Sequence, residues 1–332
     1  MPRASFFVPK IKEKSMNLTN LELQTGRISQ VQRQQFQVHS MNNFYTCVLK
    51  GSFHKPGQDI PVIGDYVLFK PNTTGNSVIY QIQPRTNIFK RPDQSGHAAT
   101  HVKTMKEQIL AANFDRVFIV ASLNQNYNLN RITRYVTITL QSNATPVVIL
   151  SKADLCDDKE TYIKQVQSIS EKVHVVAISA HTGEGMSKLQ EYLIPDSTIV
   201  LIGSSGVGKS TLINTLSQEY QMKVSGIREE DGRGHHTTTH RQLIMLTNNI
   251  AVIDSPGLRE LGMCQVDEAL EDTFQDILSL SSQCRFSNCR HQTEPGCQIR
   301  AALETGELST QRWEMYQKLE KENQWGNSKI KK

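Results

Sequence analysis

Apolar residues follow two different patterns along the chain. Between about positions 24 and 84 they occur in short, β-like runs separated by Gly, Pro and Asn. The runs cover 26–31, 35–38, 45–49, 65–69 and 77–82. Short strands at this spacing predict a small β-barrel of the OB type, although a small all-β sandwich would produce the same pattern.

A second pattern begins at position 116. Continuous apolar, β-branched runs are typical of strands buried on both faces of a parallel sheet. They cover 116–122, 146–150, 173–179, 198–202 and 250–253, with helical stretches at 130–141 and 159–172 between them. The two patterns together predict a multidomain α/β protein with a doubly wound sheet. After Gly262 we expect helices only, one through 270–278 and a last one around 313–319.

The 332-residue chain has a formal net charge of +5, and the excess is confined to its first quarter. Residues 1–91 hold 12 Lys and Arg against 4 Asp and Glu, whereas 260–332 are net acidic. A polyanionic partner should therefore meet the N-terminal region first. No apolar run approaches the ~18 residues of a membrane span, and the N-terminal apolar stretch is too short for a secretory signal. We expect a cytoplasmic protein without a membrane partner.

A phosphate-binding loop is indicated at 203–210, where GSSGVGKS matches G-x-x-x-x-G-K-[ST] between an apolar run and a helical stretch. Its backbone N–H groups would surround the phosphates of a nucleotide. Lys209 would reach the β- and γ-phosphates, and the Ser210 hydroxyl would bind Mg²⁺. The nucleotide-binding residues expected here are Gly203, Ser204, Ser205, Gly206, Val207, Gly208, Lys209, Ser210 and Thr211.

Two further segments fit the switches of a nucleotide hydrolase. In DSPG at 254–257, Asp254 suits a contact to a Mg²⁺-bound water and Gly257 a contact to the γ-phosphate. The Gly-rich loop 232–239 contains three threonines, and a hydroxyl from one of them would complete the Mg²⁺ shell. We select Thr238 over its neighbours; an ordinary surface loop is the alternative.

The segment SKAD at 151–154 predicts recognition of guanine. Asp154 can accept hydrogen bonds from the guanine N1–H and 2-amino group, which adenine does not offer, so GTP is favoured over ATP. Ser151, Lys152 and Ala153 complete this base motif. Ser179 and Ala180, in SAHTG, fit the loop that supports the base.

The base motif departs from the usual GTPase pattern at its first residue. GTPases usually have Asn where this chain has Ser151, and that Asn amide ties the base motif to the phosphate loop. A Ser hydroxyl is shorter and offers fewer hydrogen bonds. We expect Asp154 to maintain the preference for guanine. The motif does not define how tightly the nucleotide binds.

The nucleotide motifs stand in an unusual order. The base motif and its supporting loop precede the phosphate loop, and the threonine segment and DSPG follow it. In a common GTPase the phosphate loop comes first. Circular permutation explains this order, because strands of one sheet can be relinked without changing the site that they build.

Four potential metal ligands lie within 14 residues near the C-terminus. Cys284, Cys289, His291 and Cys297 form the pattern C-x₄-C-x-H-x₅-C. Three thiolates and one imidazole fit a single tetrahedral, structural Zn²⁺ with no position left open for catalysis. Free cysteines beside an unrelated histidine are the alternative. Nearby arginines are either contacts to RNA or protein, or solvated charges.

The permuted order, the segments GSSGVGKS, GRGHHTTTH and DSPGLRE, and the cysteine cluster together resemble the ribosome small subunit-dependent GTPase A family (RsgA/YjeQ type) over about residues 21–325. The resemblance implies an N-terminal OB-type barrel, a circularly permuted P-loop GTPase domain and a C-terminal helical zinc-binding domain. We accordingly expect a basic tail at 1–20, an OB-fold domain at 21–85, a linker at 86–102, the GTPase domain at 103–262 and the zinc domain at 263–332.

The same resemblance implies GTP hydrolysis coupled to late maturation of the small (30S) ribosomal subunit. The implied partners are GTP or GDP, the small subunit and its 16S rRNA, with Mg²⁺ accompanying GTP and one structural Zn²⁺; we expect a monomer. The competing interpretation is a nucleotide-gated ribosome-binding module in which hydrolysis is incidental. A metal-dependent RNA-processing enzyme is a weaker one, because no cluster of catalytic carboxylates supports it.

The chain lacks the usual water-orienting glutamine. Leu258 stands where Ras-like enzymes have Gln, and a leucine cannot orient water. His236 matches the switch histidine of the family and can hydrogen-bond a water, so it is the candidate catalytic residue. The alternative is a histidine that orders the loop or contacts RNA. We expect slow intrinsic turnover that the small subunit stimulates.

Overall fold

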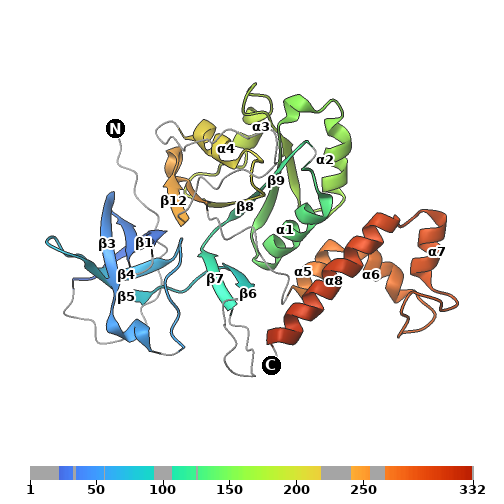
Figure 1. The fold of residues 1–332 in the computed structure, drawn as a ribbon, viewed down its shortest axis with the longest axis horizontal. Coiled ribbons are helices and arrows are strands. Elements are labelled where there is room, and N and C mark those ends of the chain that lie inside the picture. Colours follow the sequence, from blue (N-terminus) through green and yellow to red (C-terminus); the bar gives the residue numbers. More distant parts are fainter. Residues whose placement is uncertain are drawn as a thin grey trace.

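The computed structural model describes residues 22–32, 35–55, 57–92, 107–124, 126–217, 241–254 and 266–330. Within them a β-barrel, a mostly parallel sheet flanked by helices, and a group of C-terminal helices follow one another along the chain (Figure 1). None of the described helices combines the length and the apolar character needed to cross a bilayer. The predicted basic tail at 1–20 lies outside the described residues.

The N-terminal barrel confirms the strands predicted from the first pattern. Its strands are β1 (Gln24–Val31), β2 (Phe36–Ser40), β3 (Asn43–Leu49), β4 (Tyr66–Lys70) and β5 (Ser77–Ile82), with a 3₁₀ turn at Gly51–His54. The strand order β1-β2-β3-β5-β4 closes on itself because β4 pairs with β1, and β3 and β5 are parallel. Alternate side chains fill the interior, among them Ile28, Val38 and Phe69, none exposed.

The central sheet confirms the doubly wound prediction. Its parallel strands lie in the order β10-β9-β8-β11-β13, and β12 is antiparallel to β13. The strands are β8 (Arg116–Ser122), β9 (Thr145–Ser151), β10 (His174–Ala177), β11 (Thr198–Ile202), β12 (Arg241–Met245) and β13 (Ala251–Asp254), with a 3₁₀ turn at Thr247–Asn249. The apolar cores on the two faces explain why these strands are apolar throughout.

Helices cover both faces of this sheet. The apolar side chains of α1 (Leu129–Gln141) and α2 (Lys159–Gln167) belong to one core, and those of α3 (Met186–Gln190) and α4 (Lys209–Leu216) to the other. α1 begins after Asn128, whose side chain accepts a hydrogen bond from the N–H of Arg131 at 2.9 Å. The helical stretch expected at 159–172 is shorter than predicted, because α2 ends before Ser168 and a turn leads directly into β10.

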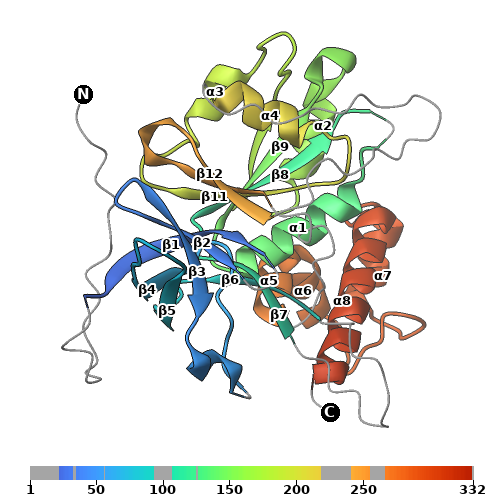
Figure 2. The ribbon, with the colours of Figure 1, turned by 60° about the vertical axis from the view of Figure 1, so that its left-hand side comes forward.

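The barrel and the central sheet are joined through their backbones. β1 of the barrel pairs antiparallel with β12, with Gln30 opposite Gln242 and Val31 opposite Arg241. This pairing makes one continuous sheet of eleven strands (Figure 2). The sequence patterns give no sign of it.

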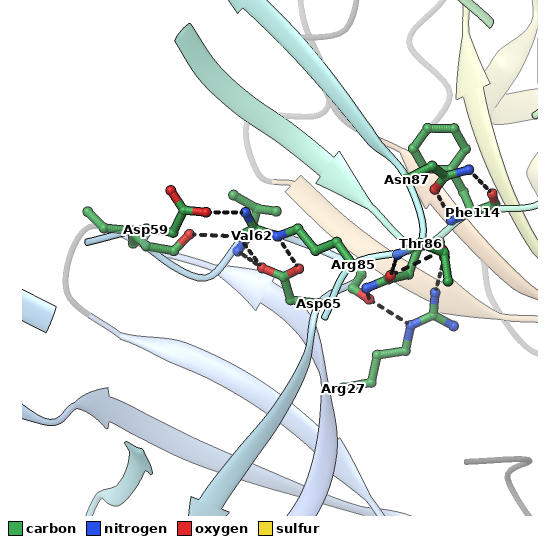
Figure 3. A network of polar contacts seen from close by, with 11 residues as sticks. Arg27, Asp59, Val62, Asp65, Arg85, Thr86, Asn87 and Phe114 are labelled. Atoms are coloured by element: carbon green, nitrogen blue, oxygen red, sulfur yellow. Dashed lines mark hydrogen bonds and ion pairs between the residues drawn. The ribbon is translucent and has the colours of Figure 1, made fainter. Parts of the chain in front are cut away.

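A buried polar network strengthens the same junction (Figure 3). Arg27 of β1 donates hydrogen bonds to the carbonyls of Asn113 at 2.8 Å and Gly64 at 3.3 Å, and the Asn113 amide also donates to Gly64 at 3.2 Å. Gly64 has φ +88° and approaches β7 so closely that a Cβ would lie 2.1 Å from the Ala112 carbonyl oxygen. Arg85 forms a bidentate ion pair with buried Asp65 on the same turn.

The segment expected to be a linker contains a strand. β6 (Ile88–Pro92) pairs antiparallel with β7 (Glu107–Ala112), and Phe89 is buried against Phe114 with ring centroids 4.5 Å apart. Residues 93–106 lie outside the described part of the chain. Proline, glycine and polar residues in this segment led to the prediction of a linker. The two strands nevertheless bury apolar side chains, among them Phe89 and Leu110.

The C-terminal region is helical, as predicted, but the helix expected through 270–278 is broken. α5 (Asp267–Thr273) ends and α6 (Gln275–Ser282) begins at Phe274, which has φ −123° and ψ 35° and is fully buried. α7 (Gln298–Thr305) and the long α8 (Thr310–Ile330) follow. This group packs on α1: the hydroxyls of Thr137 and Thr273 lie 3.3 Å apart, and Arg134 pairs with Glu322 of α8.

Candidate nucleotide and metal sites

The predicted nucleotide motifs that fall within the described residues meet at one edge of the central sheet. β8, β9, β10, β11 and β13 are parallel, so their carboxyl ends lie at the same edge. The base motif follows β9, its supporting loop follows β10, and the phosphate loop follows β11. Asp254, 5% exposed, ends β13 and lies beside Leu201 of β11. Ligand sites of open α/β sheets form at this edge.

The phosphate loop has the backbone that close contact with phosphates requires. Gly203 has φ +149°, and a Cβ there would lie 2.4 Å from the Val120 carbonyl oxygen. α4 begins at Lys209, so its N-terminus faces the loop. The Lys209 ammonium donates hydrogen bonds to the carbonyls of Gly203 at 2.8 Å and Ser204 at 2.7 Å. These bonds hold a positive charge inside the loop.

The base motif forms a tight turn after β9. Lys152 is left-handed, with φ 59° and ψ 40°, and the N–H of Ala153 donates to the Ile178 carbonyl at 3.0 Å. This bond ties the base motif to the end of β10. A hydrogen bond from the Ser179 hydroxyl, helped by the nearby positive charge of Lys152, lowers the pKa of the exposed Asp154 carboxyl. Asp154 is therefore ionised near neutral pH and can accept two N–H groups.

Ser151 connects the base motif with the phosphate loop. Its side chain is buried, and its hydroxyl donates to the Val207 carbonyl at 2.6 Å. The bond joins residues 56 positions apart in sequence. The connection that GTPases usually make with Asn is thus made here by a serine.

Three of the candidate site residues cannot be placed. His236, Thr238 and Gly257 lie outside the described residues, as does Leu258, so the expected catalytic histidine and the threonine ligand of Mg²⁺ remain predictions. Ser210 lies in the first turn of α4 and is partly exposed, and Thr211 follows it. Ala180 directly follows buried Ser179.

The structure brings the four predicted metal ligands together. The sulfur atoms of Cys284, Cys289 and Cys297 and a ring nitrogen of His291 all lie within 4.8 Å of one another. Nδ1 of His291 is 3.6 Å from the Cys284 sulfur and 3.4 Å from the Cys297 sulfur. A tetrahedral zinc ion, with bonds of ~2.3 Å to sulfur and ~2.0 Å to nitrogen, separates such ligands by about 3.5 Å. The donor set and its spacing therefore fit zinc.

The electrostatics of the cluster also favour a cation. Burial and the neighbouring thiols raise the pKa of Cys289 to about 11. Burial also opposes ionisation of Cys284, but hydrogen bonds from the N–H groups of Gln298 and Ile299 and from the thiols of Cys289 and Cys297 together lower the pKa of that thiol. Thiols so close together cannot all ionise unless a positive charge compensates them, and a divalent ion supplies that charge.

Two residues around the cluster could not be singled out from the sequence. The Ser281 hydroxyl lies 3.2 Å from Nε2 of His291, so it can accept the Nε2 proton and leave Nδ1 free for a metal. The Trp313 ring of α8 packs edge-on against His291, with centroids 5.6 Å apart. In the sequence Trp313 is only an apolar helix position, and Ser281 gives no signal at all.

Comparison with known proteins extends these observations. Residues 82–264 match the family described as RsgA GTPase, and residues 25–79 match the RsgA N-terminal domain. A relative from Listeria monocytogenes, called "Small ribosomal subunit biogenesis GTPase RsgA 2", is 40% identical over 299 residues, which are 90% of this chain and 83% of the relative. A relative of the same name from Lactiplantibacillus plantarum is 42% identical over 79% of this chain and 72% of its own length.

Two solved structures share the fold. The crystal structure of YjeQ from Thermotoga maritima has a TM-score of 0.64 and 25% identity, and the match covers 90% of this chain and 97% of that protein. YloQ, described as a circularly permuted GTPase, has a TM-score of 0.58 and 24% identity over 92% of this chain and 96% of its own. The barrel, the permuted nucleotide-binding sheet and the C-terminal helices are thus an arrangement found in other proteins.

Proposed function

This chain belongs to the RsgA GTPase family, and from that we propose that it acts on the small ribosomal subunit and couples GTP hydrolysis to late maturation of that subunit. The observation that carries the proposal is the meeting of the base motif, the phosphate loop and Asp254 at one sheet edge, although they stand in permuted order along the chain. The names of the relatives supply the ribosomal target.

Each element of the site has a role in this proposal. Lys209, already positioned inside the loop, neutralises the β- and γ-phosphates, and Asp154 selects guanine. The Ser210 hydroxyl, Asp254 and Thr238 would hold the Mg²⁺ that accompanies GTP, and the ion would neutralise the phosphate charge. His236 orients the attacking water in place of the glutamine that Leu258 replaces.

The remaining parts of the chain contact the ribosome. Zinc, held by Cys284, Cys289, His291 and Cys297, makes the C-terminal domain rigid and takes no part in hydrolysis. The barrel meets 16S rRNA through its excess of basic side chains. The protein acts as a cytoplasmic monomer. Its proposed units are the OB-fold domain at 21–85, the GTPase domain at 103–262 and the zinc domain at 263–332. A closed barrel within 24–82, a wound sheet within 116–254 and helices within 267–330 support this division.

GTP turnover by the purified protein, with and without small ribosomal subunits, tests this function. We expect slow turnover alone and stimulation of at least roughly tenfold by the subunit, as for GTPases that depend on a partner. Lys209→Ala is the control, because it removes the phosphate contact and leaves the barrel and the zinc cluster untouched. Nucleotide-dependent binding to the subunit without stimulated turnover would favour the alternative, a nucleotide-gated ribosome-binding module.

A further inference from the structure

The bond between Ser151 and the phosphate loop has a consequence for how the nucleotide is recognised. The Ser151 hydroxyl oxygen lies 2.6 Å from the Val207 carbonyl oxygen and 3.3 Å from the Ala121 carbonyl oxygen. Both neighbours only accept hydrogen bonds. Ser151 is 7% exposed as a residue and its bond to Val207 is buried, so water has little access to the hydroxyl.

A hydroxyl has one proton, and here it is already engaged. The shorter, stronger bond to Val207 takes that proton, which leaves the Ser151 oxygen able only to accept. The guanine edge that carries O6 and N7 also consists of acceptors. Ser151 therefore cannot donate to that edge while it holds the phosphate loop. An Asn amide has two N–H donors, so one could hold the loop and the other could serve the base.

We infer that Ser151 is a positioning residue that connects the base motif to the phosphate loop with its only proton, and that N7 of guanine is consequently not read at this position. Guanine is then distinguished from other bases by Asp154 alone, which accepts hydrogen bonds from the N1–H and 2-amino group on the opposite edge of the base. Ser151 is well placed for this role, because a Cβ on Gly208, the residue just before α4, would be 3.9 Å from its hydroxyl oxygen. The inference rests on the proposed binding of guanine nucleotides.

Calorimetric titration of the full-length protein with four nucleotides tests the recognition of N7. The probes are GDP, 7-deaza-GDP, IDP and ADP, each with Mg²⁺. We expect 7-deaza-GDP, which lacks only the N7 acceptor, to bind within about twofold of GDP. IDP lacks the 2-amino group and should bind at least roughly tenfold more weakly than GDP, because one oxygen of the Asp154 carboxylate is left unpaired. A tenfold preference of the wild type for GDP over 7-deaza-GDP would overturn the inference.

Three substitutions at one position test the connecting role. Ser151→Ala should weaken the binding of GDP and 7-deaza-GDP by the same factor, about fivefold, because the phosphate loop is no longer tied to the base motif. Ser151→Thr retains a hydroxyl and should restore the affinity to within about twofold of the wild type. Ser151→Asn should raise the preference for GDP over 7-deaza-GDP to about fivefold, since it supplies a second donor.

The outcomes separate this inference from the proposed function. Equal binding of GDP and ADP would refute guanine recognition itself and with it the proposed function. A clear preference for GDP over ADP, combined with full affinity in Ser151→Ala, would leave the function standing and refute the connecting role. If Ser151→Asn fails to fold, the comparison of GDP with 7-deaza-GDP on the wild type still decides the reading of N7.

Discussion

Arg85→Ala tests the junction between the barrel and the central sheet. The Arg85 guanidinium donates to both carboxylate oxygens of Asp65, at 2.8 and 2.9 Å (Figure 3). The Asp65 side chain is fully buried, and its second oxygen also accepts the N–H of Val62 at 2.8 Å. Asp65 therefore stabilises the turn on which Gly64 presents its carbonyl to Arg27 and Asn113.

The structure sets the size of the effect. Removing one partner of a buried ion pair costs about 3–5 kcal/mol, because the remaining charge stays buried without compensation. Asp65 keeps the N–H of Val62, and the Arg85 side chain is 12% exposed, so water can enter the space that alanine leaves. We therefore expect the low end, a loss of about 3 kcal/mol in the free energy of unfolding, or roughly a hundredfold in the folding equilibrium.

Asp59 provides a matched control. It pairs with the same guanidinium at 2.7 Å, but its side chain is 68% exposed. Exposed ion pairs contribute about 0–1 kcal/mol, so Asp59→Ala should change the stability by less than about 1 kcal/mol. Adding Asp65→Asn to Arg85→Ala should recover part of the loss, because the buried carboxylate left without its partner is then neutral.

Denaturant unfolding followed by far-ultraviolet circular dichroism measures these differences. Tryptophan fluorescence is less suitable, because Trp313 and Trp325 both lie in α8 and report on the C-terminal helices. The same small loss in Arg85→Ala and Asp59→Ala would show that the buried pair does not secure the junction. The reasoning from burial would then be wrong.

Four further outcomes are expected. Lys209→Ala should abolish GTP hydrolysis in a phosphate-release assay; retained, subunit-stimulated turnover would contradict the assigned phosphate loop. Asp154→Asn should relax the preference for GTP over ATP in a competition assay, because the amide cannot accept two N–H groups, and unchanged discrimination would exclude that role. Cys297→Ala should abolish stoichiometric zinc in elemental analysis and lower the thermal stability of the C-terminal helices, whereas Cys156→Ala should change neither. Replacing exposed Lys55 and Lys70 of the barrel with Gln should reduce the salt dependence of RNA binding by about 0.7–0.9 in slope for each phosphate that is no longer neutralised; an unchanged slope would place the RNA-binding surface elsewhere.

The candidate nucleotide and metal sites could be predicted from the sequence because each motif is nearly self-contained. In the phosphate loop, glycines, a lysine and a hydroxyl stand in contiguous positions, and their chemistry depends mainly on the local strand–loop–helix backbone. The same holds for the cysteine cluster, whose four ligands lie within 14 residues and come within 4.8 Å of one another. Short β-like runs separated by turn residues likewise predicted the barrel strands, since both signals are local in the sequence.

Long-range packing could not be predicted from the sequence, because it depends on residues that lie far apart in the chain. Arg27 and Asn113 are 86 positions apart, and either residue alone is an ordinary polar side chain. The break at Phe274 follows from the burial of its ring beneath Arg312 and against Tyr316, which overrides an amphipathic pattern that would allow a continuous helix. The 3.3 Å bond from the N–H of Val266 to Asn323 of α8 is likewise a tertiary feature.

Residue types alone establish which chemical groups the chain carries, whereas the connections between its parts depend on contacts that form only when the chain folds. The carboxylate of Asp154 and the ammonium of Lys209 are fixed by residue type, and within their motifs they predict contacts to guanine and to phosphate. Whether Ser151 could replace an asparagine depended on one distance, 2.6 Å to a carbonyl 56 residues away. The pairing of β1 with β12 depended on an edge of the central sheet that exists only after folding, because unpaired backbone groups there accept any strand that the fold brings alongside.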